Sequence, residues 1–185
     1  GFNGINDKII ELAKEHNLLL IEDCCEAHGA KYKNKRVGAL SDMSCFSFYF
    51  GHHMTTIEGG MICTNDEEIY QLARMFRSHG MTREASKETH EKYAKPDVNP
   101  LFTFAVPGYN MRSSEINAVL GLVQLPRLDN TIDKRRNNLK VWLENLDTDL
   151  YFTDFDCEGN SNFALPLIWM NPFWDTKKVC KILEE

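Results

Sequence analysis

Short apolar runs alternate with amphipathic segments through the first half of the chain. Apolar side chains recur at helical spacing over residues 6–16 and over 66–78, which predicts two helices that each bury one face. The continuous apolar run 18–21 predicts a strand buried on both faces, and further strands are predicted over 43–50 and 61–64. Strands that alternate with helices indicate an α/β layered fold with a mostly parallel sheet. These strands are too few to complete such a sheet, so we expect a fragment of a larger fold.

The residue pattern of the second half of the chain differs between three consecutive regions. Residues 79–107 are polar and irregular, which predicts a long loop of the kind that is usually functional or mobile. Helices are predicted over 113–125 and 132–146. Short strands and the start of a helix are then predicted. We therefore expect residues 1–148 to be part of a large domain and residues 149–185 to begin a smaller α+β C-terminal domain.

The overall composition excludes several classes of protein. The 185 residues are 43% hydrophobic and 26% charged, as is ordinary for a soluble globular protein. A net charge of -6 argues against a nucleic-acid partner, which would need a basic surface. No apolar stretch has the length of a membrane span, and the first residues do not resemble a secretory signal. We therefore expect a cytoplasmic protein without a membrane partner.

The cysteines do not form a metal-binding pattern. No two of them have CxxC spacing, so we expect neither a metal site nor a redox motif. Cysteine is among the most buried residue types, and we expect buried, reduced thiols. The six cysteines stand at positions 24, 25, 45, 63, 157 and 180.

Three polar segments are candidates for chemistry, and the first follows the predicted strand 18–21. Within residues 22–29, Glu22 and Asp23 place carboxylates at the end of a buried strand, where they need partners. Ligands of open α/β sheets bind at this end of the strands. A helix cap or a buried ion pair would be the ordinary structural explanation.

The second and third segments lie after the next strand and before a helix. Residues 47–60 run from a strand into a loop with hydroxyls, two glycines, His52 and His53. Adjacent histidines lack the spacing of a helical metal pair, and a lone histidine is more often a surface or a satisfied core residue. In the third segment, Asn110 and Arg112 precede a helix start, which attracts anions; an ordinary cap with a solvated arginine is the alternative.

Taken together and in this order, the three segments resemble the DegT/DnrJ/EryC1/StrS family of sugar aminotransferases, which are pyridoxal-phosphate enzymes of fold type I. Each motif alone is weakly specific, but their joint order and spacing are highly specific over about residues 1–150. The resemblance implies a fragment of the three-layer, aspartate aminotransferase-like α/β fold. The motifs are Glu22-Asp23 with Glu26-Ala27-His28-Gly29, Ser41-Asp42, Phe46-Ser47-Phe48 with Glu58-Gly59-Gly60, and Gly108-Tyr109-Asn110-Met111-Arg112.

The resemblance also implies roles for particular residues. Asp23 would face the ring nitrogen of the cofactor and keep it protonated, so that the ring can withdraw electrons. Ser47 would donate to the cofactor phosphate, and Glu26 would lie near the ring hydroxyl or the substrate. Asn110 would reach the phosphate of the partner subunit's cofactor, which implies a homodimer. Two further residues would contact the nucleotide-sugar substrate: Arg112 and His79.

The sequence departs from the family at its cofactor-binding lysine. By the family's spacing this lysine falls five residues after Ser47, and that residue is His52; no lysine occurs between Lys35 and Lys87. Imidazole cannot form a stable covalent link to the cofactor aldehyde, but it can act as a general base. We therefore predict that His52 is the catalytic base and that pyridoxal or pyridoxamine phosphate is held without a covalent link.

A histidine at this position resembles the subset of the family that removes the 3-hydroxyl of nucleotide-linked 4-keto-6-deoxy sugars. One kind acts on a CDP-sugar and carries an iron–sulfur cluster, which needs several cysteines after a stretch like 77–80. Here no cysteine follows that stretch until Cys157. The resemblance therefore favours the cluster-free kind, which takes its amino group from L-glutamate and acts on GDP-4-keto-6-deoxymannose on the route to colitose.

Three alternatives stay open at this point. The chain could belong to an ordinary sugar aminotransferase with a substituted lysine, or to the CDP-sugar dehydratase. It could also belong to a catalytically dead paralogue that only binds nucleotide sugar or dimerises. The retained Asp23, Ser47 and residues 58–60 argue against the dead paralogue, because an inactive site has no need of cofactor contacts.

Overall fold

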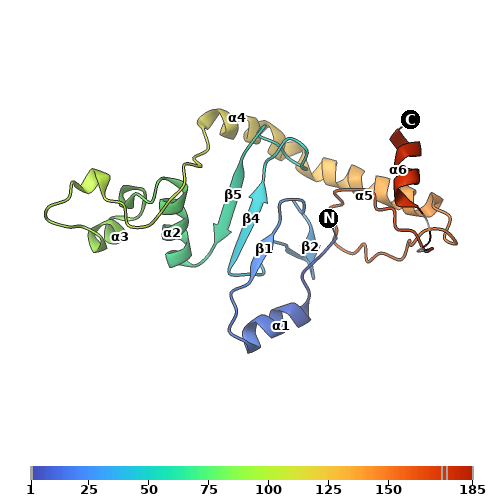
Figure 1. Ribbon diagram of the computed structural model, residues 1–185, viewed down its shortest axis with the longest axis horizontal. Coiled ribbons are helices and arrows are strands. Elements are labelled where there is room, and N and C mark those ends of the chain that lie inside the picture. The colour runs from blue at the N-terminus through green and yellow to red at the C-terminus, as the bar shows by residue number, and fades with distance from the viewer. Residues whose placement is uncertain (1, 172, 174, 185) are drawn as a thin grey trace.

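A three-stranded sheet with helices around it lies at the centre of the chain (Figure 1). The computed structural model describes residues 2–171, 173 and 175–184. In chain order the elements are α1 (Asp7–Glu15), β1 (Ile21–Asp23), β2 (Lys31–Tyr32), β3 (Lys35–Arg36), β4 (Met43–Ser47), β5 (Gly60–Thr64), α2 (Glu67–Arg77), α3 (Lys87–Lys92), α4 (Glu115–Gln124), α5 (Leu128–Asn145) and α6 (Thr176–Glu184).

The main sheet has the order β1-β4-β5 and is mixed. β1 pairs in parallel with β4, with Asp23 opposite Cys45, whereas β5 runs antiparallel to β4. The α/β class is confirmed, but the described sheet is not mostly parallel as expected. Residues 48–59 join β4 to β5 without a crossover helix, so the chain turns back and β5 pairs with the strand that precedes it.

The predicted helices of the first half are confirmed with small changes at their ends. Asn6 caps α1 by accepting a hydrogen bond from the Ile9 backbone at 3.0 Å, and Asp66 caps α2 in the same way. α4 begins at Glu115, two residues later than expected, because Ser114 is its N-cap and forms a capping box with Asn117.

One expectation about burial was wrong. Leu18, Leu19 and Ile21 are 62%, 75% and 57% exposed, although we expected the run 18–21 to be buried on both faces. Only Leu20 packs against the buried core, which is formed by Ile5, Cys24, Ala30 and Val37. In the part of the chain that the structure describes, the core covers one side of β1 and leaves the other side uncovered.

Residues 79–107 are more ordered than the sequence suggested. They contain α3 and two 3-10 helices, Thr82–Glu84 and Pro100–Phe102. Two buried threonines tie the region together, since the Thr82 backbone donates to the Thr103 carbonyl at 3.0 Å. Gly80 has a positive φ of 77°, and a Cβ there would lie 1.7 Å from the Val106 carbonyl oxygen, so only glycine fits.

The C-terminal part returns to the body of the chain after α5. Ile132 and Leu139 bury one face of α5, and the Lys31 backbone donates to the Gly159 carbonyl at 2.7 Å. Residues 157–163 therefore lie against the N-terminal half. The proposed division at residue 148 stays a prediction. None of the helices among the described residues combines the length and apolar character needed to cross a membrane.

The cysteines only partly follow the expectation of burial. All six are free, and Cys24 is buried, but Cys157 and Cys180 are exposed. Both exposed cysteines lie in C-terminal segments, after α5 and in α6, on surfaces that face solvent.

Candidate active site

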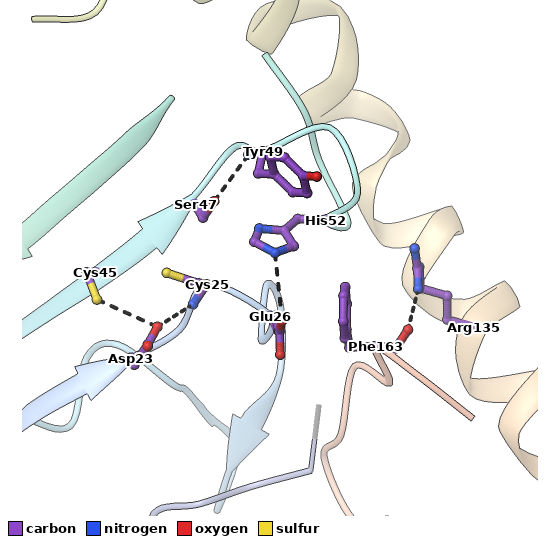
Figure 2. Close-up of polar contacts among 9 residues, drawn as sticks. All are labelled: Asp23, Cys25, Glu26, Cys45, Ser47, Tyr49, His52, Arg135 and Phe163. Atoms are coloured by element: carbon purple, nitrogen blue, oxygen red, sulfur yellow. Dashed lines mark hydrogen bonds and ion pairs between the residues drawn. The ribbon is translucent and has the colours of Figure 1, made fainter. Parts of the chain in front are cut away.

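The candidate site lies where β1 and β4 end. Asp23 is the last residue of β1 and Ser47 is the last residue of β4. Because the two strands are parallel neighbours, their carboxyl ends meet at one edge of the sheet. Figure 2 shows Asp23, Ser47 and His52 grouped at this edge. The structure thus brings together three of the residues that the sequence predicted for the site.

Asp23 is held as a carboxylate by its neighbours. Its Oδ1 accepts a hydrogen bond from the Cys25 backbone at 3.1 Å and lies 3.7 Å from the Cys45 thiol. The Cys25 thiol, with the Cys25 backbone N–H and the Cys45 thiol, lowers the pKa of Asp23. An ionised carboxylate at a strand end is suited to pairing with a protonated ring nitrogen.

The structure places the Cys45 thiol close to Cys25, a proximity that the sequence did not suggest. Asp23, Cys25 and Cys45 each offer a ligand atom, and these atoms lie within 4.8 Å of one another. Burial, followed by the hydrogen bond to Asp23, raises the pKa of Cys25 to about 12, which favours the protonated thiol that donates to Asp23. Iron–sulfur clusters usually take four cysteines, more than this group contains. We therefore interpret the two thiols as hydrogen-bond donors to Asp23, and the absence of a metal stays a prediction.

The carboxylate of Glu22 binds backbone and hydroxyl groups of the segment before β4. This is neither of the two structural roles that the sequence suggested, a helix cap or a buried ion pair. Its Oε1 accepts from the Gly38 backbone at 2.9 Å, and its Oε2 accepts from the Leu40 backbone and the Ser41 hydroxyl. Among the described residues, the Glu22 side chain neither caps a helix nor forms an ion pair. It satisfies the backbone of the turn that leads into β4, and Asp23 is left on the other face of the strand for a ligand.

A tight loop after β4 presents His52. The Ser47 hydroxyl accepts from the Tyr49 backbone at 3.2 Å, and the His52 backbone donates to the Tyr49 carbonyl at 3.1 Å. The far end of the loop is held by Asn117 of α4, whose amide donates to the Thr56 carbonyl at 2.8 Å. The strand, the turn and α4 therefore determine together where His52 lies.

The His52 ring is enclosed and has one polar neighbour. Its side chain is 13% exposed, and Nε2 lies 3.8 Å from Oε1 of Glu26. Tyr49 and Phe163 meet it edge-on, at centroid distances of 5.4 and 5.5 Å. Nδ1 is buried and has no hydrogen-bond partner among the described residues. Figure 2 shows this nitrogen on the side of the ring away from Glu26. One ring nitrogen is thus paired with a carboxylate, and the other can take up a proton.

His53 and His28 are buried next to this site and differ from His52. His53 is 5% exposed, and its Nε2 contacts the carbonyl oxygens of Ser161 and Asn162 at 3.0 Å each. Its Nε2 matches the alternative of a satisfied core histidine, whereas its buried Nδ1 has no hydrogen-bond partner among the described residues. His28 is 4% exposed, and neither ring nitrogen has a partner among the described residues. Its ring packs against Phe46 and His53.

His28 predicts an acid-sensitive fold. Burial, followed by His53 and His52, lowers the pKa of His28 to about 4. The unfolded chain binds this proton more readily, so stability should fall as pH drops from about 6.5 to about 4, by up to about 3 kcal/mol. The free energy of unfolding of the whole protein, measured across this range, should fall less steeply in His28→Leu. Equal slopes for the two proteins would contradict the prediction.

The other three predicted site residues lie elsewhere among the described contacts. Residues 108–111 run beside the end of α2: the His79 backbone donates to the Tyr109 carbonyl at 2.6 Å, and Ser78 forms a bridge with Asn110. Asn110 and Arg112 are exposed, and His79 is half-buried. No described contact joins these three side chains to Asp23, Ser47 or His52. Their roles stay predictions.

Sequence reasoning missed several residues that shape the site. Phe163 forms a wall of the His52 ring, Arg135 donates to the Phe163 carbonyl at 2.9 Å, and Asn117 anchors the loop. Phe163 stands more than a hundred residues after His52, and nothing in the local pattern marks it. Asn117 offered a weak signal, because it is a polar residue in the first turn of an apolar helix.

The arrangement fits the cofactor that the sequence motifs implied. An ionised carboxylate at the end of β1 suits a protonated pyridine nitrogen, and the hydroxyl at the end of β4 suits a phosphate. His52 lies on the loop that follows β4, with an unpaired Nδ1 in the described structure. These groups could hold pyridoxal or pyridoxamine phosphate and move a proton beside it.

The chain is similar to known proteins over nearly its whole length. The profile of the DegT/DnrJ/EryC1/StrS aminotransferase family matches residues 6–184. GDP-4-keto-6-deoxy-D-mannose 3-dehydratase of Yersinia pseudotuberculosis is 33% identical over 184 residues, which are 96% of this chain and 47% of the relative. GDP-perosamine synthase of Escherichia coli O157:H7 is 38% identical over 142 residues, 77% of this chain and 35% of the relative.

Solved structures show the same likeness. A histidine-to-asparagine variant of GDP-4-keto-6-deoxymannose-3-dehydratase with bound GDP-perosamine has a TM-score of 0.84 and 32% identity, covering 96% of this chain and 47% of its own. The same kind of enzyme with a trapped PLP–glutamate geminal diamine has a TM-score of 0.81 and 30% identity, covering 96% and 47%. The chain spans about half the length of the relatives it matches. It belongs to the DegT/DnrJ/EryC1/StrS aminotransferase family.

Proposed function

We propose that the whole protein is a pyridoxal-phosphate-dependent 3-dehydratase of a nucleotide-linked 4-keto-6-deoxy sugar. The substrate that the relatives favour is GDP-4-keto-6-deoxy-D-mannose, and the product is GDP-4-keto-3,6-dideoxy-D-mannose. The observation that carries the proposal is His52, which stands where the family's lysine is expected and lies beside Asp23 and Ser47. The reaction would serve the synthesis of colitose, a dideoxysugar of lipopolysaccharide O-antigens.

The cofactor and the amino donor follow from the site and the relatives. When bound, the cofactor supplies an electron sink and carries an amino group to the 4-keto carbon of the sugar. The structural relative with a trapped PLP–glutamate adduct supports L-glutamate as the donor of that group. Asp23 would face the ring nitrogen and Ser47 the phosphate. We propose no iron–sulfur cluster, because residues 64–156 contain no cysteine.

His52 would move the protons of the reaction. Its Nδ1 would take a proton from the methylene carbon of the cofactor that carries the amino group, since this nitrogen has no partner in the described structure. The charged imidazolium would be stabilised by Glu26, 3.8 Å from Nε2. The same imidazolium can then protonate the departing 3-hydroxyl oxygen. A single group that first accepts and then returns a proton is sufficient for loss of water.

The walls around His52 would keep the transferred proton on the ring. Tyr49 and Phe163 cover the ring from two sides and leave it 13% exposed. Limited access of water slows exchange of the proton with solvent and strengthens the interaction with Glu26.

We propose that Arg112 and His79 contact the nucleotide sugar.

A homodimer completes the proposal. Asn110 would reach the partner's cofactor, and its exposed position permits this. On α4, Ile116, Val119 and Leu122 share one face and are 74%, 61% and 71% exposed. An uncovered apolar face of this kind is typical of a surface that a second copy buries. A monomer mass for the whole protein in light scattering would contradict this part of the proposal. We place the dimer in the cytoplasm.

The decisive experiment is an incubation of the whole protein with pyridoxal phosphate, L-glutamate and GDP-4-keto-6-deoxy-D-mannose. We expect a 3-deoxy sugar, ammonia and 2-oxoglutarate. Heat-inactivated protein and a reaction without glutamate serve as controls. A stable 4-amino sugar would instead identify an aminotransferase, the activity of the GDP-perosamine synthase relative. The CDP-linked substrate, offered in parallel, tests the choice of nucleotide.

A further inference from the structure

A run of four backbone carbonyls lies next to the candidate catalytic base, and side chains from elsewhere in the fold donate to each of them. We call residues 160–163 the carbonyl segment. Its first three residues are 4%, 0% and 4% exposed. The contacts are Arg136 Nε to the Asn160 carbonyl, His53 Nε2 to the Ser161 and Asn162 carbonyls, and Arg135 Nη1 to the Phe163 carbonyl.

His53 differs from the two arginines because it comes from the loop that carries His52. It bridges 108 and 109 residues of sequence to reach the Ser161 and Asn162 carbonyls, both at 3.0 Å. Carbonyl oxygens only accept hydrogen bonds, so Nε2 must carry the proton. Burial lowers the pKa of His53, so the ring is neutral at pH 7. His53 therefore acts as a fixed N–H donor between the loop and the carbonyl segment.

The carbonyl segment ends in a wall of the His52 ring. The Phe163 ring meets the His52 ring at 5.5 Å and 76°. Tyr49 meets the same ring at 5.4 Å and 68°. The approach of the ring to Glu26 is long, at 3.8 Å, so the orientation of the ring depends largely on these two aromatic walls. Tyr49 belongs to the same loop, whereas Phe163 has to be brought from the far end of the chain.

We propose that His53 is a positioning residue for His52. By donating to two carbonyls of the carbonyl segment, it holds Phe163 against the His52 ring and keeps that ring in one orientation. Arg135 supports the same wall from α5 (Figure 2). The inference rests on the proposed role of His52 as the base. The two neighbouring histidines would then have different roles. His52 moves protons, and His53 keeps the His52 ring in its orientation.

The test compares two substitutions of His53 in the whole protein. His53→Phe keeps a planar ring but removes the donor, and His53→Gln is the matched control because its amide N–H can reach the same carbonyls. We expect kcat for dehydration to fall about 10- to 100-fold in His53→Phe, since displacement of a reacting group by about 1 Å can cost this much. We expect KM for the nucleotide sugar within about 3-fold of wild type, and His53→Gln within about 5-fold in kcat.

Other results would overturn the inference. Unchanged kcat in His53→Phe would show that Phe163 needs no such support. An equal loss in both variants would show that the donor is not what matters, and a loss confined to KM would indicate a binding role. Cofactor absorbance and thermal midpoints show whether each variant binds cofactor and folds. His52→Asn, measured in parallel, tests the base itself: if it dehydrates normally, His52 is not the base and the inference about His53 fails with it, whereas a wild-type protein that makes no 3-deoxy sugar contradicts the proposed function.

A second pair of variants keeps the test decisive if His53→Phe does not fold. Phe163→Leu removes the aromatic wall directly, and Arg135→Met removes its support from a half-buried position. Each should lower kcat with little change in KM. Because both changes act through the same wall, the double variant should lose about as much as Phe163→Leu alone. Fully additive losses would contradict a shared pathway through Phe163.

Discussion

His52→Asn should slow dehydration severely while cofactor binding persists. Asparagine keeps a polar side chain of similar size but cannot take up a proton, so kcat should fall by about 10²- to 10⁴-fold, the usual contribution of a general acid–base. Because Asp23 and Ser47 are untouched, pyridoxal phosphate should bind with an affinity close to that of wild type. The measurement is product formation from GDP-4-keto-6-deoxy-D-mannose, with cofactor absorbance as the binding readout.

Two further variants test whether the effect is specific to His52. One is a control at another histidine, and the other restores the family's lysine. His16 lies exposed just after α1, before the start of β1 and not at its carboxyl end, and His16→Asn should leave the rate unchanged. His52→Lys returns the family's residue, and we expect a borohydride-reducible, lysine-linked cofactor without dehydration. Normal dehydration by His52→Asn would remove His52 from the mechanism.

Asp23→Asn should reduce turnover almost as severely. The amide cannot hold a positive charge on the ring nitrogen, so the cofactor would lose the protonated state that lets it withdraw electrons. By comparison with other electrostatic contacts at reacting centres, kcat should fall by about 10²- to 10³-fold. The rate of the glutamate half-reaction, followed by cofactor absorbance, should fall together with that of dehydration, since both need the charged ring.

Asp42→Asn is the matched control for Asp23→Asn. Asp42 lies just before β4, at the opposite ends of the same two strands, and its Oδ2 accepts from the Leu20 backbone at 2.8 Å. An asparagine oxygen can accept the same bond, so turnover should be nearly unchanged. Equal losses in the two variants would indicate damage to the sheet rather than loss of the charge at Asp23.

Much of the fold could be predicted because it depends on local pattern. Asn6 and Asp66 precede apolar repeats, and both act as helix caps. The antiparallel pairing of β5 and the exposure of Leu18 and Leu19 could not be predicted, because they depend on which elements lie beside a strand. The short helices within 79–107 were missed, since their polar sequence lacks an apolar period.

The contacts of two thiols and two histidines at the site also could not be predicted from the local sequence. Cys25 and Cys45 stand twenty residues apart, and only the parallel register of β1 and β4 brings both to the Asp23 carboxylate. His52 and His53 looked alike as neighbours in sequence. In the structure, the first faces Glu26 and the second is buried against Ser161 and Asn162.

The sequence by itself determined the α/β class, the family and the residue to examine first, because motif order and the spacing from Ser47 to His52 are properties of the linear chain. Only the tertiary structure decided what surrounds that residue. Register places Asp23 beside the two thiols, and the return of residues 160–163 brings Phe163 and the acceptors of His53. Contacts between segments more than a hundred residues apart arise from packing, and packing leaves no periodic mark in the local sequence.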